Sequence, residues 1–151
     1  MQNADDALAF AIERSCSIKA AVVAEDEREG GVRAHLNFGH TFGHAIERLQ
    51  GYGEWLHGEA VAAGMVIASR LSANRGLLEG SVVERLIEFN QTLDLPTSLP
   101  AGISTAQLLK AMGSDKKVAA GKVRYILLST LGEATVSEHV TEDDIARVIT
   151  A

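Results

Sequence analysis

Two histidines, His40 and His44, stand four residues apart in the stretch LNFGHTFGHAIE, which covers residues 36–47. On an α-helix, residues four apart lie on one face, so the two imidazoles would project side by side. Imidazoles at this spacing can serve a divalent metal ion or a small polar site. This stretch is therefore the first candidate for a site of chemistry.

A third histidine, His57, follows the turn sequence GYGE at residues 51–54 and stands at the predicted start of the next helix. Such a turn would fold His57 back towards the first two histidines. Gly39 and Gly43 lie in the same helical turn as the pair and leave room for a neighbouring backbone or a ligand. Three imidazoles from a hairpin of two helices form a candidate divalent-metal pocket.

Several features allow a plainer interpretation of these residues. No Glu lies between His40 and His44, so the zinc-protease pattern H-E-x-x-H is absent. Glu47 shares the face of His44 but lies about 10 Å from His40 along the helix axis; it is either a partner of a ligand or an ordinary helix charge. Glu59 would complement the dipole of the next helix. The non-enzyme alternative is a helical module whose histidines are core or surface residues.

A long amphipathic helix is predicted for residues 4–27, before the glycines at positions 30 and 31. Its stripe at spacings of three and four consists of Leu8, Ile12, Cys16, Lys19 and Val23. Lys19 is the odd member of this apolar set. Either its methylene stem packs while the ammonium reaches water, or the ammonium serves a site.

Further polar and cationic side chains lie in two predicted loops. Arg33 and Asn37 belong to VRAHLN, and Lys116 and Lys117 belong to GSDKKVAAGK. Each would alone be an ordinary surface residue, but beside imidazoles such groups suit a metal together with a phosphorylated or carboxylated small molecule. Nothing marks His35 or His139 as part of a site, so both are interpreted as structural or surface residues.

The elements that position these residues are mostly helical. Helices are predicted for residues 39–49, for 57–74 with Gly76 as the stop, for 81–93, for the segment between Ser104 and Gly113, and from Thr141 to the C-terminus. Ser81 with Glu84 is typical of a capping box, and Thr141 with Asp144 starts the last helix. Residues 123–128 and 134–140 predict one small β-hairpin around Leu131–Gly132. The expected fold is a single, mainly α domain over residues 1–151, whose helices share one core.

The composition limits the class of protein. The chain has 151 residues, a net charge of −6 and a single cysteine. An acidic chain has no cationic surplus for nucleic acid, and one cysteine excludes an internal disulfide. The sequence shows neither an apolar run of about 18 residues, as a membrane helix needs, nor a basic segment that opens a secretion signal. A cytoplasmic protein without membrane or nucleic-acid partners is therefore expected.

Three motifs carry a resemblance to a known family. RAHLNFGHTFGHAIE, then LHGEAVAAGM, then SDKKVAAGKVRYILL resemble the C-terminal domain of 3-dehydroquinate synthase, and the likeness extends over essentially the whole chain. The three histidines alone would also fit related metal-dependent polyol dehydrogenases. The combination of Lys19, Arg33, Asn37 and the DKK loop favours the synthase.

The resemblance implies a function and a set of roles. Enzymes of the family convert 3-deoxy-D-arabino-heptulosonate 7-phosphate to 3-dehydroquinate and phosphate, a step of the shikimate pathway to aromatic amino acids. They use NAD and a divalent metal, for which zinc is the expected ion and cobalt the alternative. The resemblance implies that His40 and His57 are metal ligands and that His44 contacts the substrate and transfers protons. Spacing alone, in contrast, suggests that His40 and His44 are both ligands. The resemblance also implies that Lys19, Arg33 and Asn37 contact the substrate, and that Lys116 or Lys117 reaches its phosphate.

The chain also departs from the family pattern. The family's third metal ligand, a glutamate, and its NAD-binding α/β domain belong to a region upstream of the matched segment, and no G-x-G-x-x-G loop occurs here. This 151-residue piece is therefore expected to lack catalytic activity by itself and to bind metal weakly. The family suggests a homodimer. Another sugar-phosphate cyclase, such as a valiolone- or deoxy-inosose-type synthase, is the main alternative within the enzyme class.

Overall fold

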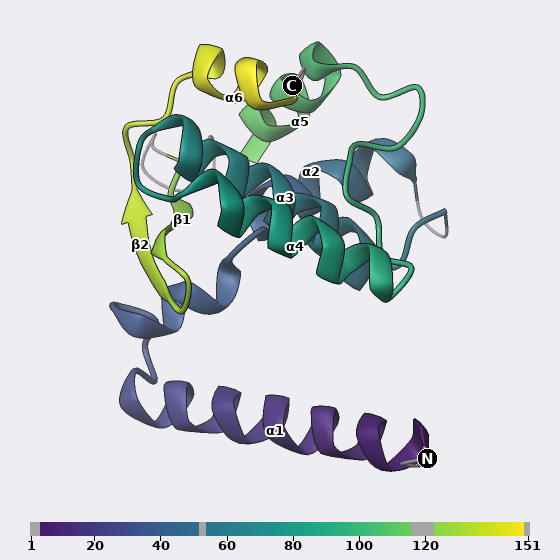
Figure 1. Cartoon of the computed structure of the whole chain (residues 1–151). Helices are drawn as coiled ribbons and strands as arrows, with labels where there is room; N and C mark the ends of the chain where they lie inside the picture. The colour runs from purple at the N-terminus through teal and green to yellow at the C-terminus, as the bar shows by residue number, and fades with distance from the viewer. Residues whose placement is uncertain (1–3, 52–53, 116–122, 150–151) are drawn as a thin grey trace. The chain divides into compact units, whose positions relative to one another are not determined.

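The computed structural model describes residues 4–51, 54–115 and 123–149. They form α1 (Ala4–Glu25), the 3₁₀ helix η1 (Val32–Asn37), α2 (His40–Gln50), α3 (His57–Asn74), α4 (Gly80–Thr92), α5 (Thr105–Asp115), strands β1 (Tyr125–Thr130) and β2 (Glu133–Ser137), and α6 (Glu142–Ile149) (Figure 1). The predicted fold class, mainly helical with one hairpin, is confirmed. The chain divides into two units, residues 1–36 and 37–151, and each is described by itself.

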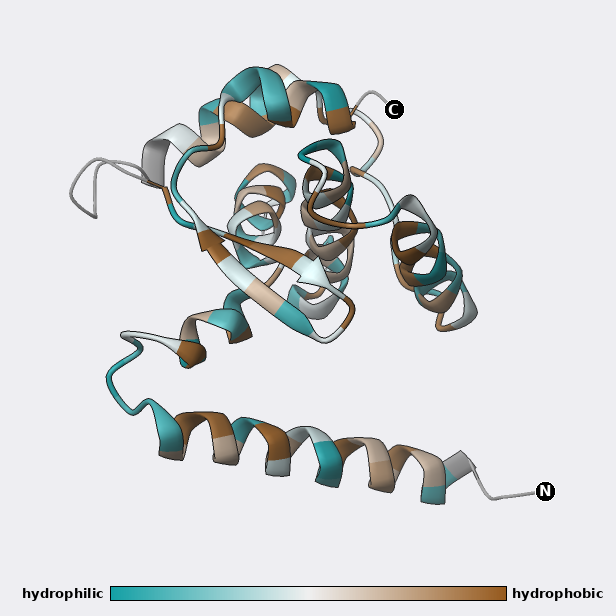
Figure 2. Cartoon of the chain, turned by 60° about the vertical axis from the view of Figure 1, so that its left-hand side comes forward, coloured by the Kyte–Doolittle hydropathy of each residue, from teal (hydrophilic) through white to brown (hydrophobic). Residues whose placement is uncertain are grey.

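The first unit consists of α1 and most of η1. Hydrophobic residues recur along α1 among polar ones (Figure 2), but the predicted stripe is not buried: Leu8 and Ile12 are 60% and 56% exposed. Lys19 and Cys16 are exposed too. A unit of 36 residues with one long helix has too little chain to cover that helix by itself. A core that α1 shares with the other helices stays a prediction.

Helix α3 is the centre of the second unit, where it packs against α2, α4, β1 and α6. Its buried side chains are mostly alanine, valine and isoleucine, and they face neighbours on several sides. Small side chains let these neighbours approach closely, which explains why one helix is covered nearly all round. The main core joins α3 to α2, α5, β1 and α6 through Phe42, Ile46, Ile67, Leu71, Leu108, Leu127 and Ile145.

The hairpin covers one side of α3. β1 and β2 pair antiparallel, with Tyr125 opposite Ser137 and Leu128 opposite Ala134. Gly132 turns the chain with a φ of 92°, a conformation that favours glycine. The Ser72 hydroxyl on α3 donates to the Ala68 carbonyl at 2.8 Å and accepts the Leu128 N–H at 3.0 Å, which ties the strand to the helix.

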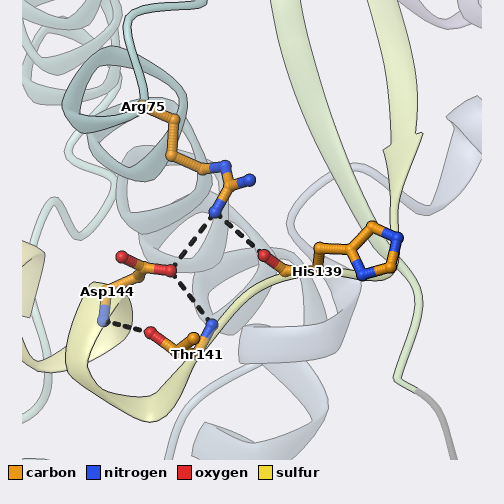
Figure 3. A network of polar contacts seen from close by, with 4 residues as sticks. All are labelled: Arg75, His139, Thr141 and Asp144. Carbon is orange, nitrogen blue, oxygen red and sulfur yellow. Dashed lines mark hydrogen bonds and ion pairs between the residues drawn. The ribbon is translucent and has the colours of Figure 1, made fainter.

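The last helix is held at its first turn by the predicted capping pair. The Thr141 N–H donates to the Asp144 carboxylate at 3.0 Å, and the Asp144 N–H donates to the Thr141 hydroxyl at 3.1 Å (Figure 3). Arg75, which follows α3, donates to the same carboxylate at 3.2 Å and to the His139 carbonyl at 3.0 Å. One guanidinium thus links the end of α3 to α6.

Other boundaries differ from the sequence prediction. The N-cap of α4 is Glu79, and no side chain caps it, so the predicted Ser81–Glu84 box is wrong. The helix begins at Gly80, which places Ser81 already inside its first turn. Helix α5 starts as expected, with Ser104 and Gln107 exchanging hydrogen bonds, but runs on to Asp115. The predicted loop VRAHLN is a 3₁₀ helix.

A candidate metal centre between two helices

The two histidine-bearing helices approach each other through glycines. Gly39 caps the N-terminus of α2 with a φ of 83°, and a Cβ there would lie 2.8 Å from the Val61 carbonyl oxygen. A Cβ on Gly43 would lie 3.1 Å from the Val61 Cα, and one on Gly64 would overlap the Gly39 carbonyl oxygen. Backbone therefore packs directly on backbone at this crossing. The first turn of α2 is held beside α3 as a result.

The three imidazoles converge, as the sequence predicted. The ring centroids of His40 and His44 lie 5.5 Å apart, those of His40 and His57 lie 5.4 Å apart, and those of His44 and His57 lie 5.8 Å apart. The near-equal distances form a triangle between the start of α2 and the start of α3. The three rings are thus immediate neighbours.

Two of the three rings are anchored through Nδ1. His40 Nδ1 lies 3.3 Å from the Phe38 carbonyl oxygen, and His57 Nδ1 lies 3.1 Å from Glu47 Oε2. Each of these acceptors favours the tautomer with its proton on Nδ1 and its lone pair on Nε2. Within the described residues, no hydrogen bond reaches the His44 ring. The structure thus separates two imidazoles with an Nδ1 partner from His44, which has no such partner among the described residues.

Electrostatics favour a neutral His40. Burial lowers the pKa of His40 below its usual value, although the hydrogen bond to the Phe38 carbonyl opposes this shift; the neighbouring His44 and His57 lower the pKa further. A metal ligand must offer a deprotonated nitrogen, and a depressed pKa keeps it available at neutral pH. Oriented imidazoles are donors expected of a zinc or cobalt site, so the residues present fit such an ion.

A carboxylate lies beside two of the three histidines. Among the described residues, ligand atoms of His44, Glu47 and His57 all lie within 4.8 Å of one another, and His40 is not in this set. The sequence leaves Glu47 as either a ligand's partner or a plain helix charge, and its contact with a histidine of the other helix favours the first interpretation. Glu59 accepts the Leu56 N–H at 2.6 Å and so fixes the start of α3, where His57 is the first residue.

The remaining predicted site residues lie elsewhere along the chain. Lys19 and Arg33 belong to the first unit and Asn37 to the second, so a common site for Lys19, Arg33 and the histidines stays a prediction. Lys116 and Lys117 lie outside the described residues. Asn37 ends η1, two residues before the glycine that caps α2.

Arg33 is held by a turn that sequence reasoning missed. The Asp26 carboxylate accepts N–H groups from Gly30 at 3.0 Å, Gly31 at 2.7 Å and Arg33 at 3.1 Å. The hydrogen bond from Gly31 is the largest cause of the lowered pKa of Asp26. The Arg33 guanidinium donates to the Glu27 carbonyl at 2.5 Å. An aspartate four residues before a Gly-Gly pair was the available signal, because such a side chain can accept the N–H groups of the turn.

Comparison with known proteins decides the family. The model of the family described as 3-dehydroquinate synthase C-terminal matches residues 1–118. The chain belongs to this family. Relatives of the 3-dehydroquinate synthase C-terminal family include the 3-dehydroquinate synthases of Shewanella frigidimarina, 51% identical over 95% of this chain, and of Colwellia psychrerythraea, 47% identical over 94%. The chain spans 40% of the length of each of these relatives.

Solved structures related to the 3-dehydroquinate synthase C-terminal family share the fold. A 2-epi-5-epi-valiolone synthase from Streptomyces hygroscopicus, with NAD⁺ and Zn²⁺ bound, is 26% identical, with a TM-score of 0.82 over 93% of this chain and 39% of its own. A 2-deoxy-scyllo-inosose synthase complexed with carbaglucose-6-phosphate, NAD⁺ and Co²⁺ is 27% identical, with a TM-score of 0.72 over 88% of this chain and 38% of its own. None of the described helices is both long and apolar enough to cross a membrane.

Proposed function

We propose that this chain is the metal- and substrate-binding part of a 3-dehydroquinate synthase, which eliminates phosphate from 3-deoxy-D-arabino-heptulosonate 7-phosphate to give 3-dehydroquinate. The observation that carries the proposal is the triangle of imidazoles, His40, His44 and His57, with centroids 5.4–5.8 Å apart, in a chain 51% identical to a 3-dehydroquinate synthase. The reaction would belong to the shikimate pathway and to the cytoplasm, and the protein would act as a homodimer.

His40 and His57 are the proposed metal ligands. Their Nδ1 anchoring supports this choice over the pair His40 and His44, because ligating histidines nearly always have the second ring nitrogen hydrogen-bonded. His44 is exposed and has no such anchor among the described residues, which suits a group that contacts substrate and moves a proton. When bound, a divalent metal supplies Lewis-acid polarisation of the oxygen being oxidised, and NAD supplies the hydride acceptor.

The cationic and amide side chains would bind the negative and hydroxyl groups of the substrate. Lys19, Arg33 and Asn37 are the proposed contacts, with Lys116 or Lys117 at the phosphate. Fixed positive groups orient an anionic substrate and stabilise charge that develops during elimination. The three hydrogen bonds to Asp26 hold the backbone at Arg33 in a defined turn, which limits the conformations available to that guanidinium.

On this proposal, NAD is bound mainly by the segment of the relatives that this chain does not match. The 151 residues alone should therefore release no phosphate. A fusion of this chain to the unmatched part of the S. frigidimarina enzyme should release phosphate and lose that activity with a chelator. Retention of full activity after metal removal would contradict the proposal.

Two competing functions are tested with the same fusion. A valiolone-type cyclase would prefer sedoheptulose 7-phosphate to the heptulosonate phosphate. The two structural relatives are a valiolone synthase and an inosose synthase, but they are only 26% and 27% identical. A polyol dehydrogenase would accumulate NADH, whereas the synthase recycles its cofactor. Heptulosonate-dependent phosphate release without net NADH is the expected result.

Single variants test the ligand assignment. His40→Ala and His57→Ala should each weaken zinc affinity of the chain by at least about tenfold, while His44→Ala should leave affinity largely unchanged and remove phosphate release from the fusion. Isothermal calorimetry with Zn²⁺ measures the first effect. Equal loss of affinity in all three variants would replace the proposed set by a three-histidine site.

A further inference from the structure

The carboxylate of Glu47 lies across the gap between the two site helices. Glu47 stands one turn after His44 on α2, and its Oε2 lies 3.1 Å from Nδ1 of His57, the first residue of α3. The contact joins partly accessible groups, with the Glu47 and His57 side chains 34% and 56% exposed. We propose that Glu47 is a positioning residue that fixes the tautomer and ring orientation of His57, an inference that rests on the proposed role of His57 as a metal ligand.

The argument follows from the donors and acceptors of the two groups. An ionised carboxylate has only acceptors, so the proton in this contact belongs to His57 Nδ1. The lone pair of the neutral imidazole is then on Nε2, the atom opposite Glu47. Without Glu47, the exposed ring would exchange between tautomers and rotate about its side-chain torsions.

The hydrogen bond to Glu47 is important for His57 in particular because of where His57 lies in the chain. His40 is part-buried and uses a backbone carbonyl, at Phe38, only two residues away on its own chain segment. His57 follows a turn and has no equivalent backbone acceptor among the described residues. Its orientation relative to His40 therefore depends on a side chain from the opposite helix. Glu47 couples the two halves of the site.

The alternative role for Glu47 is direct ligation, since His44, Glu47 and His57 offer ligand atoms within 4.8 Å of one another. The two roles predict different responses to Glu47→Gln. A glutamine oxygen can still accept the Nδ1 proton, so a positioning role is partly preserved, whereas a neutral amide is a poor zinc ligand. Glu47→Ala removes both functions.

The experiment compares Zn²⁺ affinity and the ring ¹⁵N shifts of His57 in the 151-residue chain. Glu47→Ala should weaken zinc binding by about 10–100-fold and move the metal-free His57 away from the Nδ1–H tautomer, with Glu47→Gln intermediate in both measurements. Glu54→Gln, the control, removes an exposed carboxylate from the preceding turn and should change neither. Circular dichroism confirms that each variant keeps its helices.

Three results would overturn the inference. Unchanged affinity and tautomer in Glu47→Ala would remove the positioning role while leaving His57 as a ligand. Equal losses in Glu47→Gln and Glu47→Ala, with an unchanged metal-free tautomer, would make Glu47 a ligand itself. Unchanged affinity in His57→Ala would instead defeat the proposed ligand set, and this inference with it.

Discussion

Gly64 of α3 faces the carbonyl oxygen of Gly39, the residue that caps α2, so closely that a single methyl group cannot fit between them. A Cβ at Gly64 would also lie 2.9 Å from the Gly43 backbone nitrogen. All the nearest atoms are backbone, which cannot rotate away as a flexible side chain would. The separation of the two histidine-bearing helices is thus set by the absence of a side chain at position 64.

Gly64→Ala should push α2 away from α3. We expect a destabilisation of about 1–3 kcal/mol, the usual cost of overpacking, together with weaker zinc binding. Urea denaturation and zinc titration measure the two effects. Gly58→Ala is the matched control in the same helix, because nothing lies within 4 Å of a Cβ there; its stability should be equal or higher. A stable, zinc-binding Gly64→Ala protein would show that the helix crossing does not set the site.

Two buried serines on α3 should respond oppositely to loss of their hydroxyls. Ser69 and Ser72 are both 0% exposed. Ser69 Oγ has no hydrogen-bond partner in the part of the chain that the structure describes, whereas Ser72 Oγ accepts the Leu128 N–H. Ser72→Ala leaves that N–H unsatisfied and should cost about 1–3 kcal/mol. Ser69→Ala removes an unpaired polar group and should be neutral or stabilising. Chemical denaturation of the two variants makes the comparison, and equal losses would contradict it.

The capping carboxylate of α6 should make stability depend on pH. Hydrogen bonds from the Thr141 N–H and hydroxyl, followed by the charge of Arg75, lower the pKa of Asp144. A depressed carboxyl pKa adds stability above the unfolded pKa, and this is lost as pH falls through the folded pKa. Asp144→Asn should therefore destabilise the chain by about 0.5–2 kcal/mol at pH 7, with the difference closing as pH falls below about 4.

Asp143→Asn is the control for this pH effect. It removes the same charge from the same first turn, but the capping pair and the Arg75 contact use Asp144 and not Asp143. Urea midpoints at pH 7 and pH 3 should show a pH-dependent loss for Asp144→Asn alone. The same pH profile in both variants would assign the effect to helix-dipole charge instead of the cap.

The turn around Asp26 should protect its backbone amides. Asp26→Asn replaces a charged acceptor of three N–H groups, so amide hydrogen exchange at Gly31 and Arg33 should become roughly two- to tenfold faster, the range that a net hydrogen bond provides. Glu27→Gln changes a neighbouring charge without touching these bonds and should leave the rates unchanged. Identical rates in Asp26→Asn would show that the turn does not need its carboxylate.

The sequence was sufficient for features that depend on local pattern. The bounds of α3, the hairpin turn at Leu131–Gly132 and the capping pair at Thr141 follow from spacing and turn chemistry, and each agrees with the structure. The meeting of His40, His44 and His57 was predictable for the same reason, since a short turn between two helices brings their adjoining ends together.

Other features depend on which residues pack against a given helix face. The spacing of residues along the sequence carries no information about those packing partners. The spacing of Leu8 and Ile12 places them on one face of α1 but does not say what covers that face. The axial distance from Glu47 to His40 argued against shared ligation on one helix, yet carried no information about His57, which comes from another helix. The position of Gly64 against Gly39 is likewise a property of the crossing, visible only in three dimensions.

All the proposed metal-centre residues come from residues 40–57, on two helices that are consecutive in the chain. Bringing them together therefore requires closing only one short loop, and the entropic cost of loop closure grows with the length of chain enclosed. Contacts between near neighbours in sequence also form early in folding. We therefore expect α2 and α3, with the imidazole triangle, to form a folding nucleus by themselves. Strand β1 and helix α6, which are far away in the sequence, would pack onto it later.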